Sequence, residues 1–477
     1  MIAILVKFYF LLNIFQQAYY DYPLYFDWLK KHFVRNNILF VFLLLMFFYR
    51  QWYIYLLLML CSVIYFICYF KKEKKHLKIT KRVVRLIIVF ILLSLISKLF
   101  FPYFIIFLLA DIILLLTNAF LMPIEKMIDR YYINQARKKI NNHASVKIAI
   151  TGSFGKTSVK NFCQQALSNL FYVKASPKSY NTPLGIAKFI NAENFDMVDF
   201  IIYEFGARHP KDILELRNLY KYDLAIVTEV GVMHLDTFHS IDNILDTKMD
   251  ILNGLNSDGI AILNYENELI RNYPIKCQVK SFGFNYGTYQ ARNIKLGLSE
   301  STFDLFIANK FVKTIKTSLI GKHMILNLLP ALIICDLFNI DYQVVEKTTS
   351  VDNRLQYRRV NDFHLLMDAY NSNLVGAKNA LEVVKMHSGK RFIITPGFVE
   401  SNQLIVELAN EYARVINESV DVALLIDNDF TNLMKEKLIV PYHAFVGFDI
   451  AYNFFLTNHQ QDSLLLVEND WLDVYLK

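Results

Sequence analysis

Cysteine is scarce in this sequence, and the few cysteines present argue against two kinds of site. Of the 477 residues, 5 are cysteine. Cys61 and Cys68 lie in an apolar stretch, whereas Cys163, Cys277 and Cys335 are isolated. Because no CxxC pair occurs, the sequence indicates neither a zinc site nor a disulfide framework. Reduced thiols, as in a cytosolic compartment, are the simplest interpretation.

Two further signatures are missing. The region after Phe363 contains no GxGxxG motif, so the sequence does not imply a dinucleotide cofactor. Lys7 interrupts the first apolar stretch, and no small-residue cleavage site follows that stretch. A cleaved signal peptide is therefore not expected.

Acidic residues are outnumbered by basic ones. The chain has 51 Lys and Arg against 43 Asp and Glu, which gives a formal net charge of +8. A basic chain can bind nucleic acid, but the densest basic run, Lys71–Arg85, lies between apolar stretches. Basic residues beside membrane helices usually set topology and contact anionic lipid. We therefore expect membrane lipid, and no nucleic acid, as the partner of this run.

Apolar residues are abundant, at 54% of the chain with a mean hydropathy of +0.28, and the excess lies before Pro123. This excess predicts an N-terminal membrane region over residues 1–122. Its five apolar stretches are Ile2–Tyr19, Asn37–Tyr49, Trp52–Phe70, Leu86–Phe101 and Tyr103–Met122.

Basic runs between these stretches predict helical hairpins in a cytoplasmic membrane, a multi-pass arrangement with the rest of the chain on the cytoplasmic side. The number of crossings stays open, because Leu86–Met122 could also form a monotopic hairpin. Few charges fall within the stretches beyond Lys98 and Asp111, which favours an anchor over a transporter. Residues 123–145 would form a polar connecting helix.

A phosphate-binding motif follows the connector. The apolar run Val146–Ile150 precedes TGSFGKTS, and a helical pattern continues to about Leu170. A strand, a glycine turn and a helix N-terminus together form a site for phosphate oxygens. The motif is a compressed TGxxGKT rather than GxxxxGK[ST], because Ile150 stands where the first glycine would be. We predict that ATP binds to Gly152, Ser153, Phe154, Gly155, Lys156, Thr157 and Ser158.

Individual side chains in and after this motif have predicted roles. Lys156 can reach the β- and γ-phosphates, and the Thr157 hydroxyl can bind Mg²⁺. Glu204 ends the apolar run 199–203, and His234 follows the run 224–228. Because the carboxyl ends of parallel strands share one sheet edge, Glu204 and His234 are expected near the phosphate motif. Lys248, taken alone, would be an ordinary solvated lysine.

The ordered series of motifs resembles the Mur ligases. TGSFGKTS resembles the ATP loop of the family, and SYNTPLG (179–185) resembles its substrate loop. YEFGARHPKDI resembles the segment with the metal-binding glutamate, and TEVGVMHLDTFHSIDNILDTKMDIL resembles the segment with a metal-binding histidine and a carbamylated lysine. The pattern is most like the members that join D-alanyl-D-alanine to UDP-N-acetylmuramoyl-tripeptide.

The resemblance implies further site residues. Thr157, Glu204, His234 and a carbamylated Lys248 would bind Mg²⁺, with two ions expected. The substrate residues implied by the resemblance are Asn181, Thr182 and Asn371.

Later motifs extend the ATP site. GKHMILN implies that His323 and Asn327 contact adenine, DNRLQ supplies Arg354, and DAYNSN supplies Asp368. Lys156, His234, Lys248 and Arg354 would be catalytic.

Several positions depart from the family pattern. The soluble N-terminal domain that holds the uridine nucleotide is not recognisable, and the predicted membrane region stands in its place. Met324, Asn353 and Leu374 replace an asparagine, a glycine and a proline of the family motifs. The ATP site is therefore better supported than the acceptor and amine sites.

The fold expected is α/β, with the helical membrane region followed by two domains. Residues 146–349 would form a central P-loop ATPase domain with a parallel sheet, to which Lys276–Leu319 adds a small antiparallel part. Residues 350–477 would form a C-terminal Rossmann-like domain. Its predicted strands lie near Leu365–Asp368, Phe392–Thr395, Val422–Ile426 and Leu464–Val467.

The resemblance implies an ADP-forming peptide ligase of peptidoglycan synthesis that acts through an acyl phosphate and releases phosphate. Two alternatives remain open. One is a polyglutamate-type synthase with the same ATP core, and the other is a nucleotide-gated membrane scaffold without ligase chemistry.

Overall fold

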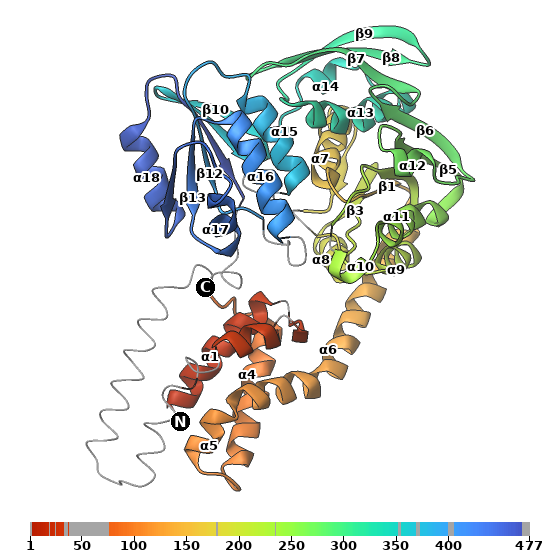
Figure 1. The fold of residues 1–477 in the computed structure, drawn as a ribbon. Helices are drawn as coiled ribbons and strands as arrows, with labels where there is room; N and C mark the ends of the chain where they lie inside the picture. The colour runs from red at the N-terminus through yellow and green to blue at the C-terminus, as the bar shows by residue number, and fades with distance from the viewer. Residues whose placement is uncertain are drawn as a thin grey trace. The chain divides into compact units, whose positions relative to one another are not determined.

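The computed structural model shown in Figure 1 describes residues 2–18, 20–23, 25–32, 37, 76–177, 180–233, 235–351, 354–368, 373–398 and 405–469. The chain divides into two compact units, one within Met1–Arg130 and the other within Tyr131–Asp470. The helix α6 (Ala110–Asn141) begins in the first unit and ends in the second.

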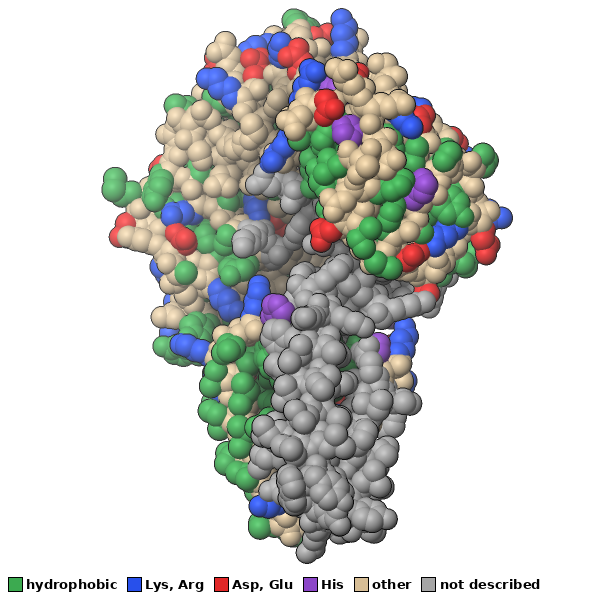
Figure 2. All heavy atoms as spheres, turned by 90° about the vertical axis from the view of Figure 1, so that its left-hand side faces the viewer, with side chains coloured by type: hydrophobic (Ala, Val, Ile, Leu, Met, Phe, Trp, Pro, Cys, Tyr) green, Lys and Arg blue, Asp and Glu red, His purple; other side chains and the backbone are tan. Residues whose placement is uncertain are grey.

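The first unit is helical. Its helices include α1 (Ile2–Gln17), α4 (Lys81–Ser97), α5 (Tyr103–Leu108) and the first part of α6. Their apolar side chains pack against one another, and the rings of Phe8 and Phe90 stack with centroids 3.7 Å apart. Hydrophobic side chains also reach the surface of this unit (Figure 2), among them Ile88, Leu92 and Ile96, each 53% exposed.

Ion pairs link segments within this unit. Lys7 Nζ lies 2.8 Å from Asp111 Oδ2, and both side chains are largely buried. Arg85 donates two hydrogen bonds to the Glu125 carboxylate, at 2.6 and 2.7 Å. These pairs join groups that lie in or beside different apolar stretches of the sequence, so they stabilise packing between helices of one unit.

The predicted multi-pass membrane localisation is contradicted by this structure. Among the described residues, no helix combines the length and the apolar character needed to cross a bilayer. α4 has 17 residues with three basic side chains among its first five, α5 has 6 residues, and α6 carries Asp111, Asn118 and Glu125 along its 32 residues. The structure supports neither the predicted membrane anchor nor the predicted lipid partner. The stretches 38–49 and 52–70 lie outside the described residues.

The second unit contains a nine-stranded sheet with strand order β2-β3-β1-β4-β5-β6-β7-β8-β9. In the order given, the strands from β2 to β6 run parallel, and β7, β8 and β9 are each antiparallel to the next. The antiparallel part predicted for Lys276–Leu319 is therefore confirmed for β7, β8 and β9 but wrong for β6, which pairs in parallel with β5 and β7. The strand bounds are β1 Val146–Thr151, β2 Val173–Ala175, β3 Phe200–Glu204, β4 Tyr222–Val227, β5 Leu255–Asn264, β6 Gln278–Gly283, β7 Tyr289–Lys295, β8 Ser301–Ile307 and β9 Lys310–Thr317.

Helices cover both faces of this sheet, because its central strands are apolar on both sides. α7 (Lys156–Leu167) and α13 (Lys322–Leu337) pack together on one face. The other face carries α8 (Pro183–Ala192), α9 (Asp212–Leu219), α11 (Ile241–Met249) and the end of α6. The short helices are α10 Leu235–Phe238, the 3₁₀ helix Asp250–Gly254, α12 Glu268–Arg271 and α14 Gln343–Glu346.

The C-terminal part contains a six-stranded sheet with strand order β10-β11-β15-β12-β13-β14, parallel except for β10. Helices α15 and α16 cover one face and α18 covers the other (Figure 1). The bounds are β10 Gln356–Val360, β11 Phe363–Asp368, α15 Leu374–Val384, β12 Arg391–Thr395, α16 Ile405–Ser419, β13 Val422–Ile426, α17 Asp429–Lys435, β14 Tyr442–Phe445, α18 Phe448–Asn458 and β15 Leu464–Glu468.

Candidate active site

The phosphate loop (Thr151–Ser158) connects β1 to α7 at the carboxyl edge of the nine-stranded sheet. Two positions in the loop require glycine. Gly152 has φ +147° and Gly155 has φ +81°, in the region that side chains rarely adopt. A Cβ atom on Gly155 would lie 2.5 Å from Asn327 Oδ1, and one on Gly152 would collide with Thr228 Oγ1. The loop backbone therefore lies directly against β4 and α13.

Hydrogen bonds fix the loop to the segment after β4. Thr228 Oγ1 donates to the Phe154 carbonyl at 2.5 Å, and Ser153 N donates to the Glu229 carbonyl at 2.6 Å. Ser153 Oγ donates to the Gly231 carbonyl at 2.9 Å and accepts from the Gly231 N–H at 3.1 Å. The loop is thus held in one shape, with the first N–H groups of α7 lacking acceptors inside the helix.

Lys156 folds back over this loop. Its Nζ donates to the carbonyls of Gly152 and Ser153, at 2.7 and 3.2 Å. Burial lowers the pKa of Lys156, Glu204 opposes that shift, and the charge of Arg354 adds to it. An ammonium group therefore lies beside the helix N-terminus, and the two together suit an anion.

Glu204 is the last residue of β3 and is 2% exposed. Its Oε2 accepts from Thr157 Oγ1 at 3.0 Å and pairs with Lys160 Nζ at 3.1 Å, while Oε1 accepts from Asn181 Nδ2 at 3.3 Å. Burial alone would raise the pKa of Glu204, but Lys160 and Lys156 outweigh it, and the pKa lies below its ordinary value. The carboxylate is therefore ionised at neutral pH.

Two neighbours of Glu204 were not identified in the sequence. Lys160 lies one helical turn after Lys156, so the spacing in GKTSVK could have placed it on the same side of α7. Ser176 accepts the Glu204 N–H at 3.2 Å through its hydroxyl. The sequence offers no comparable sign for Ser176, which follows the short strand β2.

Lys248 lies on α11 and is 2% exposed. Its Nζ donates to the Ala207 carbonyl at 3.4 Å and lies 5.9 Å from the Phe238 ring centroid. Burial lowers the pKa of Lys248 well below its ordinary value, and repulsion from Lys156 adds to the shift. The expectation that Lys248, taken alone, is a solvated lysine is therefore wrong. Its ammonium group loses a proton far more readily than that of an exposed lysine.

The predicted adenine-side residues lie around the start of α13. Asn327 contacts Gly155, as described above. Burial lowers the pKa of His323 to about 4, and within the described part of the chain its Nδ1 has no hydrogen-bond partner. Burial raises the pKa of Asp368 to about 6, although the Leu355 N–H donates to its Oδ1 at 3.2 Å. The charge of Arg354 acts on both Asp368 and Lys156.

The remaining predicted residues are less informative. The Thr182 hydroxyl caps α8 by accepting from the Gly185 N–H at 3.2 Å. Ser158 is buried in α7. His234 and Asn371 lie outside the described residues.

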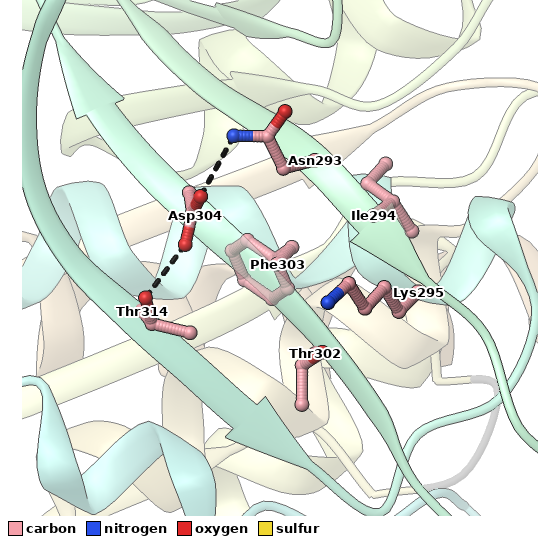
Figure 3. Close-up of a pocket in the computed structure, with 7 residues that line it drawn as sticks. All are labelled: Asn293, Ile294, Lys295, Thr302, Phe303, Asp304 and Thr314. Atoms are coloured by element: carbon pink, nitrogen blue, oxygen red, sulfur yellow. Dashed lines mark hydrogen bonds between the residues drawn. The ribbon is translucent and has the colours of Figure 1, made fainter.

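A cavity of about 560 Å³ lies elsewhere, on the antiparallel strands β7, β8 and β9 (Figure 3). Within it, Asp304 accepts hydrogen bonds from Asn293 and Thr314, at 2.8 and 2.6 Å. None of the predicted site residues lines this cavity. We take the phosphate loop, rather than this cavity, as the candidate active site. Two glycines with positive φ, two lysines and a buried carboxylate meet at the loop.

Comparison with known proteins gives relatives for the part of the chain that contains the phosphate loop. Residues 150–335 match the Mur ligase middle domain. A UDP-N-acetylmuramoyl-tripeptide--D-alanyl-D-alanine ligase of Rickettsia prowazekii (strain Madrid E) is 29% identical over 288 residues, which are 58% of this chain and 61% of that protein. The chain therefore spans less than two thirds of the length of that relative.

Solved structures share the fold. The MurF ligase from Thermotoga maritima, crystallised in complex with ADP, has a TM-score of 0.66 and 20% identity over 72% of this chain and 80% of that chain. Folylpolyglutamate synthase from Mycobacterium tuberculosis has a TM-score of 0.55 and 14% identity over 73% of this chain and 95% of that chain. At these identities the likeness concerns the fold alone.

Proposed function

We propose that this chain, which carries a Mur ligase middle domain at residues 150–335, is an ATP-dependent ligase that adds D-alanyl-D-alanine to UDP-N-acetylmuramoyl-tripeptide. One observation carries the proposal: the Glu204 carboxylate accepts a hydrogen bond from the Thr157 hydroxyl at 3.0 Å and is close enough to the Lys156 ammonium for that charge to lower its pKa. The similarity to the Rickettsia ligase supports the substrates named here. Residues 146–349 and 350–477 are proposed as the ATPase and C-terminal domains.

The phosphate loop suits a triphosphate. Its glycines let the backbone approach closely, and the N-terminus of α7 and Lys156 provide positive charge. We place adenine near His323 and Asn327, since Asn327 lies against Gly155. His323 would contact adenine as a neutral imidazole, because burial lowers its pKa to about 4.

The residues beside the loop suit Mg²⁺, which prefers oxygen ligands. Thr157 and Glu204 would hold one ion, and His234 with a carbamylated Lys248 would hold a second. Mg²⁺ bound there would neutralise the charge between the γ-phosphate and the acceptor carboxylate. Carbamylation joins the Lys248 nitrogen to the carbon of CO₂ with loss of one proton, and a deprotonated amine is the form that reacts. The lowered pKa of Lys248 favours that form.

The reaction proposed has two steps. The terminal carboxylate of the acceptor peptide attacks the γ-phosphorus of ATP, which gives an acyl phosphate and ADP. The amine of D-alanyl-D-alanine then attacks the acyl carbon, phosphate leaves, and the nitrogen loses a proton. Lys156 stabilises the charge on the transferring phosphoryl group. Arg354 and Asp368 would complete the site from the start of the C-terminal domain.

The acceptor is proposed to contact the loop that contains Asn181 and Thr182, since Asn181 lies 3.3 Å from the Glu204 carboxylate. Asn371 is proposed as a further substrate contact.

A substrate panel tests this function. The purified chain is supplied with ATP, Mg²⁺, UDP-N-acetylmuramoyl-tripeptide and D-alanyl-D-alanine, and each component is omitted in turn. We expect ADP release and a product of the summed mass, less water, only in the complete mixture. Polymer formation from glutamate would instead identify a polyglutamate-type ligase. Nucleotide binding without turnover on any acceptor would identify a scaffold.

A further inference from the structure

A second cluster of metal-ligating side chains lies far from the phosphate loop in the fold. His364 is near the amino end of β11, His387 lies between α15 and β12, and Asp462 precedes β15. These three strands are neighbours in the order β11-β15-β12. Because parallel strands begin at the same sheet edge, the three residues meet at the amino edge. We call His364, His387 and Asp462 the amino-edge cluster.

The donor atoms of this cluster are close together. His364 Nε2 donates to Asp462 Oδ1 at 2.7 Å, and His387 Nε2 donates to the Asp462 carbonyl oxygen at 2.6 Å. The two imidazole rings are 5.0 Å apart between centroids. One donor atom from each residue lies within 4.8 Å of the others. The Asp462 side chain is 57% exposed, so a small rotation can bring its carboxylate closer to both rings.

Tyr357 orients one of the histidines from outside the cluster. Its hydroxyl lies 2.6 Å from His364 Nδ1, and its ring lies nearly parallel to the imidazole, with centroids 5.7 Å apart. In this structure Nε2–H donates to the Asp462 carboxylate, and Nδ1 accepts from the tyrosine hydroxyl. When a metal ion takes the place of the Nε2 proton, the same hydroxyl can accept a hydrogen bond from Nδ1–H. Partners of this kind fix the tautomer and direction of metal-binding histidines.

The backbone closes one side of the cluster at Gly389. A Cβ atom there would lie 2.7 Å from His387 Nε2 and would also collide with the Asp462 carbonyl. Glycine therefore lets the imidazole, the carbonyl and the chain lie in close contact. His387 is 7% exposed and the His364 side chain is 12% exposed, so water reaches the cluster mainly from the side of Asp462.

We propose that the amino-edge cluster binds a divalent transition-metal ion of the zinc type. Two imidazoles and one carboxylate suit Zn²⁺ and its neighbours better than Mg²⁺, which prefers oxygen ligands alone. The ion would connect β11, the α15–β12 loop and the α18–β15 turn. The site is distinct from the proposed ATP site, since Asp368 lies at the opposite end of β11 from His364.

The test uses the full chain after chelator treatment, titrated with ZnCl₂ by calorimetry in excess MgCl₂. We expect the wild-type chain to bind one equivalent more than the variants His364→Gln and His387→Gln. In both variants the affinity of this site for Zn²⁺ should fall by at least about 10–100-fold, since removing a residue that is only hydrogen-bonded to a metal ligand already causes a loss of that size. Zn²⁺ taken up by the proposed ligase site would remain in every variant. With CoCl₂ in place of zinc, visible absorption bands should appear in the wild type and weaken in both variants.

His459→Gln is the matched control, because His459 lies at the same sheet edge but pairs with Asp362 at 3.3 Å, outside the cluster. This variant should bind as the wild type does. If circular dichroism shows that the two cluster variants misfold, Tyr357→Phe is used in their place. This substitution removes only the hydroxyl and should weaken the binding of Zn²⁺. Equal binding by the wild type, the cluster variants and Tyr357→Phe would overturn the proposal. Failure of zinc or cobalt to bind the wild type would do the same, whatever the outcome of the ligase assays.

Discussion

Lys160 and Glu204 form an ion pair that is almost completely removed from water. Nζ lies 3.1 Å from Oε2, and the side chains are 3% and 2% exposed. The same Oε2 accepts the Thr157 hydroxyl at 3.0 Å. The carboxylate proposed to bind Mg²⁺ is therefore held by a cation from the helix that follows the phosphate loop.

Replacing Lys160 by Met should destabilise the chain by about 3–5 kcal/mol, because Glu204 would remain as a buried charge without its partner. Lys160→Arg should restore part of that stability. Since Lys160 contacts Glu204 and Mg²⁺ is proposed to bind the same carboxylate, Lys160→Met should also change the Mg²⁺ concentration that half-saturates ATP turnover. Urea denaturation and a Mg²⁺ titration of ADP release measure the two effects.

Lys378→Met is the control for this prediction. Lys378 pairs with Glu411 at 2.8 Å, but the two side chains are 42% and 31% exposed. Exposed pairs contribute about 0–1 kcal/mol, so stability should barely change. A loss of similar size in both variants would contradict the role assigned to burial at Lys160.

Lys248→Ala should lower turnover by roughly 10²–10³-fold, the loss typical of removing one electrostatic stabiliser at an active site. Short carboxylates such as acetate should restore part of the rate, because they supply the anionic oxygen of the proposed carbamate. Turnover is measured by ADP release with and without added acetate.

Lys147→Met provides the comparison. Lys147 is also buried, and burial lowers its pKa, but its Nζ donates to the carbonyls of His143 and Ser145, just before β1. Acetate should not increase its turnover. Full activity of Lys248→Ala, or equal effects of acetate on both variants, would reject the carbamate.

Gly155→Ala should destabilise the chain by about 1–2 kcal/mol and weaken ATP binding. The residue has φ +81°, and the added Cβ would lie 2.5 Å from Asn327 Oδ1. Thermal unfolding with and without ATP measures both effects. Gly376→Ala, on helix α15, is the control, because its Cβ would meet only ordinary contacts. That variant should gain about 0.4–1 kcal/mol.

Local patterns in the sequence predict much of this fold. The strand, glycine turn and helix around Thr151–Ser158 are found where the motif places them, since they depend on neighbouring residues. The four C-terminal strands predicted from apolar runs are β11, β12, β13 and β15. The strands β10 and β14 were missed because they lie at sheet edges and are largely exposed, so they lack an apolar pattern.

Contacts between residues far apart in the chain could not be predicted from the sequence. Lys7 and Asp111 are far apart in the chain, and their pairing shows that apolar stretches taken for membrane spans can pack on one another. Lys160 meets Glu204 only because β3 lies beside β1, with Glu204 level with Ile150. Such a register is set by the whole sheet, which a motif does not contain.

Asp368→Asn should stabilise the chain at neutral pH. Burial raises the pKa of Asp368 from 3.8 to about 6, so in the folded chain the charged form is disfavoured. Between these two values the folded chain binds more protons than the unfolded chain, and stability falls as pH rises. The full penalty is present above about pH 6, and a shift of this size corresponds to at most about 3 kcal/mol.

Asparagine keeps an oxygen for the Leu355 N–H but carries no charge, so the variant should lose this pH dependence. Urea denaturation at several values between pH 4 and 7 compares the two chains. We expect their stabilities to converge at the acid end and to separate toward neutral pH, with the variant more stable. If the free energy of unfolding changed with pH equally in both chains, ionisation of Asp368 would not destabilise the folded chain. Since Asp368 is also proposed to complete the ATP site, the stabilised variant should turn over more slowly, as expected where a buried charge is retained for function.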